Sequence, residues 1–184
     1  MVRQLVSRGF DVFLDLKYHD IPHTVGRACA AAADLGVWML NVHTLGGMAM
    51  MQAAKQAVGN DADSPILIGV TLLTSMDQKT FEQIGLRGKM TDTVLRLAGL
   101  AKDSGLDGVV CSAQEATTLR DNLGAEFQLI TPGIRPAGSD QGDQHRTMTP
   151  KQALEAGSHY LVIGRPVTAA ADPMKALLEI ENNL

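Results

Sequence analysis

The sequence contains few cysteines, few aromatic side chains and no apolar run long enough to cross a membrane. Only two of its 184 residues are cysteine, and aromatic residues make up 4%. Cys29 and Cys111 each stand in an apolar run and form no CxxC pair, which argues against a zinc site or a disulfide framework. We therefore expect buried free thiols. Without a signal peptide or a transmembrane segment, the expected location is the cytoplasm.

A strong charge of one sign is also lacking. The formal net charge is −4 at pH 7, so we expect no general attraction to nucleic acid or to an anionic membrane. Apolar residues make up 45% and charged residues 20%, which is typical of an ordinary soluble globular domain. The length suits one domain with a sizeable core, over residues 1–184.

No predicted strand is followed by a glycine-rich dinucleotide fingerprint or a P-loop, which argues against a Rossmann domain that binds a nucleotide cofactor. Six runs are nearly continuous in Val, Ile, Leu or Phe rather than alternating with polar residues. This pattern is typical of parallel strands that are covered on both faces. The predicted strands are residues 10–17, 37–43, 65–73, 106–111, 127–131 and 159–163.

Helical patterns lie between these strands and carry start and stop signals. Pro22 and Pro150 suit first-turn positions, Thr149 suits an N-cap, and Pro166 opens a final helix. The predicted helices are residues 2–8, 22–35, 46–58, 91–104, 113–123 and 150–156, and several end at a glycine, namely Gly36, Gly59, Gly105, Gly124 and Gly157.

The alternation of strands and helices predicts a parallel sheet with right-handed crossovers. A complete (β/α)₈ barrel needs eight units and about 250 residues, or roughly 30 per unit. The chain offers six strands, and a helix precedes the first. The predicted fold class is therefore α/β, a TIM (β/α) barrel that is incomplete, with six of eight parallel strands. We expect the two absent units to be the N-terminal ones.

The stretch FLDLKYHDIPHT, residues 13–24, places charges at the end of the first strand. Asp15 and Lys17 are two residues apart, so we expect them on the same side of the strand, at the end where barrel enzymes keep their active sites. Asp20 on the following loop could complete a carboxylate–ammonium–carboxylate array. An exposed pair would be an ordinary surface ion pair worth about 0–1 kcal/mol. In a buried array, Lys17 would be a positioned proton donor.

Two later stretches carry groups that suit an anionic ligand. In LVIGRPV, residues 161–167, Gly164 lets the backbone approach a ligand and Arg165 offers a forked donor for phosphate. The stretch 131–146, TPGIRPAGSDQGDQHR, is long and polar, and its Arg135, Gln144 and Arg146 could reach the same ligand. The alternatives are an ordinary strand–turn–helix and a surface loop. His43 ends a strand, where a hydrogen-bonded structural histidine is favoured over a site residue.

Together these stretches resemble one family, the orotidine 5′-phosphate decarboxylases, over essentially the whole chain. FLDLKYHDIPHT resembles that family's Asp-x-Lys-x-x-Asp-Ile-Pro-x-Thr signature. Further blocks resemble it in the same order and point to the bacterial subtype; they are VTLLTSM (70–76), TPGIRP (131–136), GDQHR (142–146) and IGRPV (163–167).

The resemblance implies a cofactor-free and metal-free decarboxylation of orotidine 5′-phosphate to uridine 5′-phosphate in pyrimidine biosynthesis. Lys17 would protonate C6 of the pyrimidine, and Asp15 would lie beside the departing carboxylate and hold Lys17. A homodimer is implied, in which Asp20, with Ile21 and Thr24 nearby, reaches the partner's site. The other residues implied to bind substrate are Thr74 and Ser75 at the base, Arg135 and Gln144 on the loop, and Gly164 and Arg165 at the phosphate.

The chain also departs from the family pattern. The first two strands of the family end in an aspartate that binds the ribose and a lysine of the charged array, and neither strand is evident here. Two alternatives therefore remain. One is a metal-dependent decarboxylase or aldolase of the same superfamily that acts on a sugar phosphate. The other is an inactive truncated remnant.

Overall fold

The computed structural model describes residues 1–136 and 147–184. Its six strands follow one another in chain order in one sheet, β1-β2-β3-β4-β5-β6, and the pairs β1–β2, β2–β3 and β5–β6 are parallel. The strands are β1 (Phe13–Tyr18), β2 (Met39–His43), β3 (Ile66–Val70), β4 (Gly108–Val110), β5 (Gln128–Thr131) and β6 (Tyr160–Leu161).

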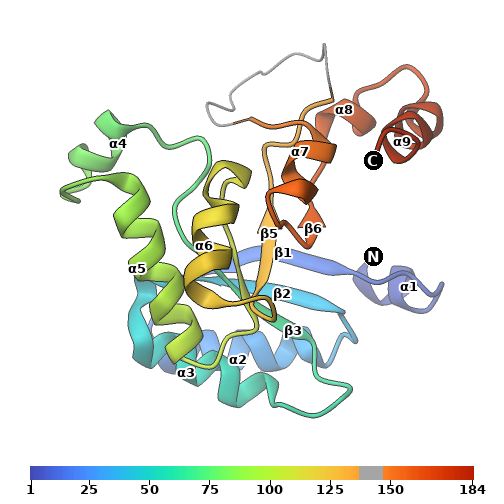
Figure 1. Ribbon diagram of the computed structural model, residues 1–184. Helices are drawn as coiled ribbons and strands as arrows, with labels where there is room; N and C mark the ends of the chain where they lie inside the picture. Colours follow the sequence, from blue (N-terminus) through green and yellow to red (C-terminus); the bar gives the residue numbers. More distant parts are fainter. Residues whose placement is uncertain (137–146) are drawn as a thin grey trace. The chain divides into compact units, whose positions relative to one another are not determined.

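Helices separate these strands (Figure 1). The α-helices are α1 (Val2–Val6), α2 (Pro22–Ala33), α3 (Gly47–Val58), α4 (Gln78–Gln83), α5 (Met90–Asp103), α6 (Ala116–Leu123), α7 (Pro150–Glu155), α8 (Arg165–Thr168) and α9 (Pro173–Glu181), and the 3₁₀ helices are η1 (Thr44–Gly46) and η2 (Ala113–Glu115). None of the helices in the described ranges is both long and apolar enough to cross a membrane.

The chain forms two compact units. The first contains Met1–Thr71 and Arg96–Val109, and the second contains Leu72–Leu95 and Val110–Leu184. Helix α5 and strand β4 are divided between them.

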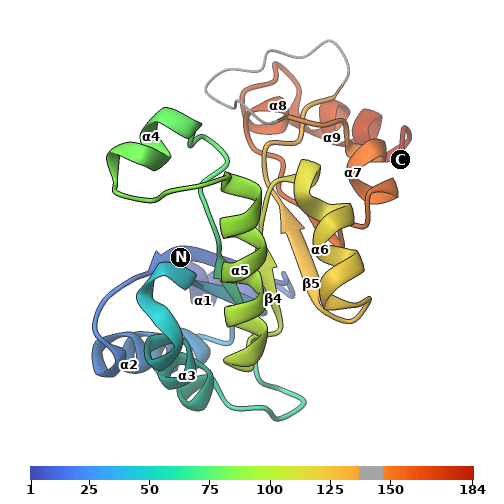
Figure 2. The ribbon, with the colours of Figure 1, turned by 60° about the vertical axis from the view of Figure 1, so that its left-hand side comes forward.

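In the first unit, α2 and α3 lie side by side along one face of the strands (Figures 1 and 2). Strand β2 is apolar apart from Asn41 and His43, and its first four residues are buried. Helix α2 buries one stripe of small residues, and a Cβ built on Gly26 would lie 3.3 Å from the carbonyl oxygen of Ala53. Glycine at this position therefore allows the two helices to approach closely. Cys29 is buried as a free thiol, as predicted.

The second unit is built around β5 and β6 and the helices that follow them. Ala113, Ile134 and Ala153 form a buried cluster, against which Met148, Leu161 and Ile163 pack. Helix α7 begins with the predicted Thr149 N-cap and Pro150, and Gln152 completes a capping box. Cys111 is the other buried free thiol.

The parallel strands in chain order confirm the predicted fold class, a TIM-type (β/α) arrangement with six strands in the described residues. The final strand is shorter than predicted, Tyr160–Leu161 instead of 159–163. A single final helix from Pro166 was a wrong prediction. Helix α8 ends at Thr168, and Asp172 caps a new helix by accepting a hydrogen bond from the Lys175 amide.

Candidate active site

Lys17 and Asp15 form an ion pair at the carboxyl end of β1. The distance from Lys17 Nζ to Asp15 Oδ1 is 2.6 Å, and the side chains are 36% and 41% exposed. The structure thus brings these two residues together as predicted, but it does not bury them. An exposed ion pair contributes only about 0–1 kcal/mol to stability.

The backbone that carries this pair is irregular. Strand β1 pairs with β2 at Phe13–Met39 and Leu14–Leu40, but the next pair is Tyr18–Val42, so β1 bulges over residues 15–17. Lys17 has φ 51°, the one positive φ among the described residues other than glycine. Left-handed backbone costs a non-glycine residue roughly 1–2 kcal/mol. Such bulges and strained residues are common at active sites.

Asn41 of β2 joins the pair and was not identified from the sequence. Its side chain is completely buried. Asn41 Nδ2 donates to Asp15 Oδ1 at 2.6 Å, and Asn41 Oδ1 accepts from the Lys17 amide at 2.8 Å. The signal available in the sequence was a single amide inside an apolar strand, because buried polar side chains are normally hydrogen-bonded to something specific.

Two histidines lie at the same end of the strands as the ion pair: His19 directly follows β1, and His43 is the last residue of β2. Their ring centroids lie 5.4 Å apart. Burial, followed by the neighbouring His19 and Lys17, lowers the pKa of His43, while Asp15 opposes that shift. Within the described residues, the buried Nδ1 of His43 has no hydrogen-bond partner. The expectation of a hydrogen-bonded structural histidine was therefore wrong at this atom.

Asp20, Ile21 and Thr24 are all exposed at the start of α2. Asp20 Oδ1 accepts a hydrogen bond from the Ile21 amide at 2.7 Å, and Ile21 is 66% exposed. Ile21 is the N-cap residue, and Pro22 takes the first helical turn as predicted. Closure of a three-membered array by Asp20 remains a prediction.

The remaining candidate residues belong to the second unit. Thr74 is buried and Ser75 is exposed, in the turn that precedes α4. Arg135 is buried, and its Nη1 donates to the Ile134 carbonyl at 2.8 Å. Gly164 is the N-cap of α8, whose first residue is the exposed Arg165. Gln144 and Arg146 lie outside the described residues.

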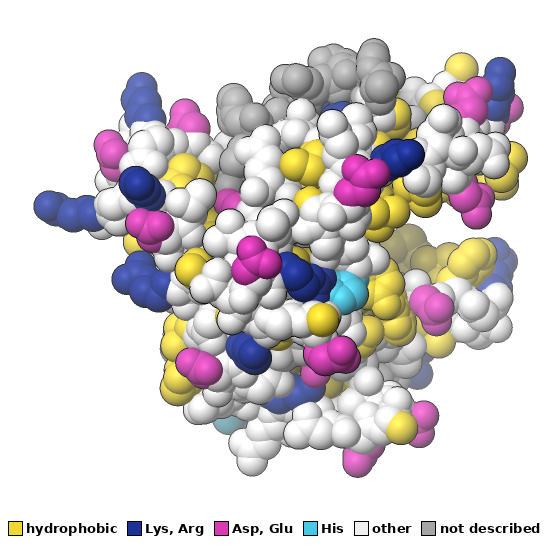
Figure 3. Space-filling view, viewed as in Figure 1, with side chains coloured by type: hydrophobic (Ala, Val, Ile, Leu, Met, Phe, Trp, Pro, Cys, Tyr) yellow, Lys and Arg dark blue, Asp and Glu magenta, His cyan; other side chains and the backbone are white. Residues whose placement is uncertain are grey.

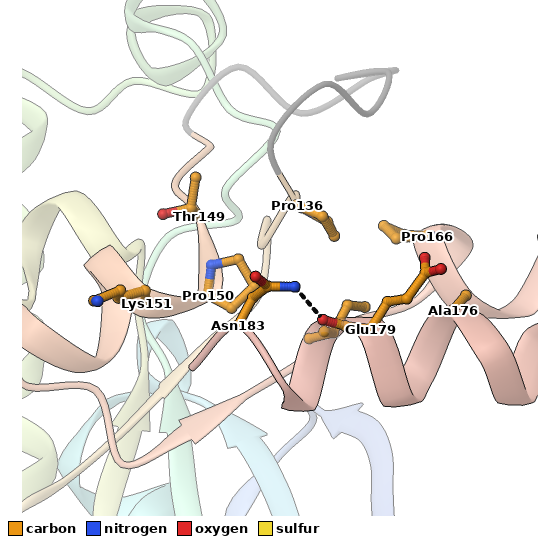
Figure 4. A pocket seen from close by; sticks show the side chains of 9 residues that line it. Pro136, Thr149, Pro150, Lys151, Pro166, Ala176, Glu179 and Asn183 are labelled. Atoms are coloured by element: carbon orange, nitrogen blue, oxygen red, sulfur yellow. Dashed lines mark hydrogen bonds between the residues drawn. The ribbon is translucent and has the colours of Figure 1, made fainter.

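Two Arg-Pro segments of the second unit border one pocket of about 520 Å³ (Figure 4). Pro136 follows Arg135, Pro166 follows Arg165, and both prolines line this pocket. Another wall is formed by Glu179 of helix α9 and by Asn183, which follows that helix; the Asn183 side-chain amide donates to the Glu179 carbonyl at 2.6 Å. The second unit therefore brings together the two segments that carry the predicted anion-binding arginines.

The charges on the surface in Figure 3 are mixed in sign. Lys and Arg side chains alternate with Asp and Glu over this face and do not gather into one patch. This distribution agrees with the small net charge of −4.

Residues 1–180 match the family described as "Orotidine 5'-phosphate decarboxylase / HUMPS family". Orotidine 5'-phosphate decarboxylase of Nitrosococcus oceani (strain ATCC 19707 / BCRC 17464 / JCM 30415 / NCIMB 11848 / C-107) is 62% identical over 181 residues, which are 98% of this chain and 78% of that relative. The protein of the same name from Hydrogenovibrio crunogenus (strain DSM 25203 / XCL-2) is 59% identical over 184 residues, covering 100% of this chain and 78% of the relative.

A solved structure supports the same assignment. The crystal structure of orotidine 5'-phosphate decarboxylase from Lactobacillus acidophilus superposes with a TM-score of 0.86 at 42% identity, covering 98% of this chain and 78% of that one. The family predicted from the motifs is confirmed. The chain belongs to the orotidine 5'-phosphate decarboxylase / HUMPS family.

Proposed function

We propose that residues 1–184 act as one decarboxylase domain, which converts orotidine 5′-phosphate to uridine 5′-phosphate in pyrimidine biosynthesis without a metal or an organic cofactor. The observation that carries this proposal is the 2.6 Å ion pair between Lys17 and Asp15 at the carboxyl end of β1. The names of relatives up to 62% identical support the choice of substrate.

The chemistry requires a cation beside the reacting carbon. The bond between C6 and the carboxylate breaks, CO₂ leaves, and the electron pair remains on C6. The Lys17 ammonium stabilises this developing charge, then transfers a proton from Nζ to C6 and becomes a neutral amine. Asp15 holds Nζ in place and lies beside the departing carboxylate. Solvent returns the proton to Lys17, which the exposure of its side chain allows.

Substrate binding is assigned to the second unit. Arg165, with the Gly164 backbone, binds the phosphate as a charge-assisted donor. Arg135 and Gln144 contribute from the loop, and Thr74 and Ser75 contact the base. Binding energy from the remote phosphate positions the pyrimidine for reaction.

The working form is a homodimer in which Asp20 of one subunit completes the site of the other, with Ile21 and Thr24 nearby. The exposure of all three residues supports this assignment. Ile21 in particular is a large apolar side chain that is 66% exposed, directly after the charged Asp20. The buried free cysteines support a reducing compartment, the cytoplasm.

The test is to measure uridine 5′-phosphate released from orotidine 5′-phosphate, with and without a chelator, with Lys17→Ala as the control. We expect turnover that a chelator leaves unchanged. Loss of turnover on chelation would favour a metal-dependent sugar-phosphate enzyme of the same superfamily. A second arm uses a version extended by the two N-terminal units. Turnover by the extended version alone would identify the 184-residue chain as the inactive remnant.

Mixing two inactive variants tests the dimer. Lys17→Ala retains Asp20, and Asp20→Ala retains Lys17, so a mixed dimer contains one complete site. We expect activity to return on mixing. If the mixture remains inactive although mixed dimers are demonstrated, Asp20 does not act in the partner's site.

A further inference from the structure

Asn41 stands opposite the bulge that carries the ion pair. From Leu14 to Tyr18, β1 advances four residues, while its partner strand advances two, from Leu40 to Val42. Asn41 is therefore the one residue of β2 that faces residues 15–17. It is completely buried, in register with Ile68 of β3 on its other side.

The chemistry of its neighbours fixes the orientation of the Asn41 amide. The backbone N–H of Lys17 can only donate, so the atom 2.8 Å from it is the amide oxygen. The amide nitrogen then faces Asp15 Oδ1 at 2.6 Å. A flipped amide would place two donors together and two oxygens together. One side chain thus binds the backbone of one member of the pair and the carboxylate of the other.

The two hydrogen bonds have separate consequences. The first supports Lys17 in its left-handed conformation, φ 51°, and so sets the origin of its side chain. The second reaches the same Asp15 oxygen that Lys17 Nζ contacts at 2.6 Å. When Lys17 loses its proton and its charge, the neutral amide of Asn41 remains as a donor to Asp15.

We propose that Asn41 is a positioning residue for the reaction, which holds the Lys17 backbone and the Asp15 carboxylate in the geometry of proton transfer. This proposal rests on the proposed function. Because Asn41 is completely buried, it acts through Lys17 and Asp15, so its loss should reduce kcat and leave KM nearly unchanged. Misplacement of a reacting group by about 1 Å can cost about 10²-fold in rate.

Two substitutions separate the two hydrogen bonds. Asn41→Asp keeps an acceptor for the Lys17 amide but sets a carboxylate against Asp15. Two facing carboxylates share a proton at lower pH, and the protonated form is again a donor. We expect kcat of Asn41→Asp to fall about 10²-fold at neutral pH and to recover as the pH is lowered, unlike that of the wild type. Asn41→Ser shortens the side chain, loses both bonds and shows no such recovery.

Amide hydrogen exchange at Lys17, followed by NMR on the 184-residue chain, gives a readout independent of activity. Exchange should accelerate about tenfold or more in Asn41→Ser, because a lost hydrogen bond worth about 1.4 kcal/mol is a factor of ten. It should stay slow in Asn41→Asp. Lys55→Met, which breaks the ion pair with Asp107 elsewhere in the unit, is the matched control and should change neither kcat nor the Lys17 amide.

The outcomes distinguish this inference from the proposed function. Unchanged Lys17 exchange in Asn41→Ser, or wild-type kcat and pH profile in Asn41→Asp, would overturn the role of Asn41. A wild-type chain without turnover, in both the 184-residue and the extended form, would instead remove the proposed function, while the exchange pattern would still report whether Asn41 holds Lys17. If Asn41→Ser does not fold, the pH profile and amide exchange of Asn41→Asp decide.

Discussion

Lys17 Nζ lies 2.6 Å from Asp15 Oδ1, yet both side chains remain more than a third exposed. An ion pair in such a position contributes only about 0–1 kcal/mol, while the left-handed φ of Lys17 costs roughly 1–2 kcal/mol. The ion pair alone therefore does not offset the cost of this backbone conformation, which is also supported by the hydrogen bonds of Asn41 to the Lys17 amide and to Asp15. Strained residues of this kind cluster at active sites, which agrees with the proposed role of Lys17.

Replacing Lys17 should separate activity from stability. Lys17→Gly relieves the positive φ, so we expect it to be about 1 kcal/mol more stable than Lys17→Ala in urea unfolding. Both variants should lose at least about 10²–10⁴-fold in kcat, the contribution of general acid catalysis. Equal stabilities of the glycine and alanine variants would show that φ 51° carries no strain, and an unchanged kcat would remove Lys17 as the proton donor.

Local signals in the sequence predicted much of the fold. Thr149 and Pro150 define a helix start through contacts within one turn, and the continuous apolar run ending at His43 identifies a covered strand. The bulge over residues 15–17 could not be predicted in this way, because the side chain that hydrogen-bonds to it, Asn41, lies on another strand, 26 residues from Asp15. The break before α9 did have a local signal, Asp172 followed by Pro173.

The candidate site was predicted unevenly for the same physical reason. Asp15 and Lys17 could be identified from the sequence because both lie in one short motif. Asn41 was missed, since an amide within a strand shows its role only when its two partners are placed. Whether Lys17 and Arg165 cluster at one end remains a prediction, because they belong to different compact units.

Arg165 should act on binding. Arg165→Ala removes a charge-assisted contact to phosphate worth roughly 1.5–3 kcal/mol, so we expect kcat/KM to fall by the corresponding factor and the affinity for uridine 5′-phosphate to fall with it. Affinity for uridine should not change. Arg165→Lys keeps the charge but not the forked guanidinium, so its kcat/KM should lie between those of the wild type and of Arg165→Ala. Equal wild-type affinity for uridine and its phosphate would contradict the assignment.

The ion pair of Lys55 and Asp107 should matter for stability in the first unit. Lys55 Nζ donates to both carboxylate oxygens of Asp107, at 2.9 and 3.0 Å, and Asp107 Oδ2 also accepts from the Leu67 amide at 2.8 Å. The Lys55 side chain is only 13% exposed. We expect Lys55→Met to lower the free energy of unfolding by about 1–3 kcal/mol, the cost of leaving a partly buried group without its partner.

A double-mutant cycle checks this interpretation. Asp107→Asn should keep an acceptor for the Leu67 amide while removing the charge. We expect the effects of Lys55→Met and Asp107→Asn to be non-additive by at least about 0.5 kcal/mol, because the residues are in contact. Additive effects would show that the two charges do not interact.

The surroundings of His159 predict a loss of stability in mild acid. His159 Nδ1 accepts from the Leu129 amide at 3.0 Å and lies 2.9 Å from Nη2 of Arg120. Both neighbours are donors, so this nitrogen must be unprotonated. The same guanidinium donates to the carbonyls of Ala125 and Gly157. Protonation of His159 at Nδ1 would place a third donor against the Leu129 amide and the Arg120 guanidinium.

Burial, and then the charge of Arg120, lower the pKa of His159, while a backbone contact to Ala125 and the carboxylate of Glu126 oppose the shift. Because the pKa in the folded state lies below the ordinary value of 6.5, the unfolded chain binds the proton more readily. The stabilisation is therefore complete above about pH 6.5 and is lost as the pH falls from there through the folded-state pKa. His43, whose pKa is also lowered, adds a dependence of the same sign.

Substituting each histidine in turn measures how much it contributes to the pH dependence of the free energy of unfolding. Asn at position 159 presents an oxygen near the place of Nδ1, so His159→Asn should retain an acceptor for the Leu129 amide without titrating. Urea unfolding between pH 7.5 and about 5 should then show a smaller loss of stability than in the wild type. His43→Asn should remove the remaining part of the dependence, and the double variant should have the flattest profile. If His159→Asn loses as much stability as the wild type over this range, the Arg120–His159 contact does not sense pH, and the dependence must arise elsewhere in the chain.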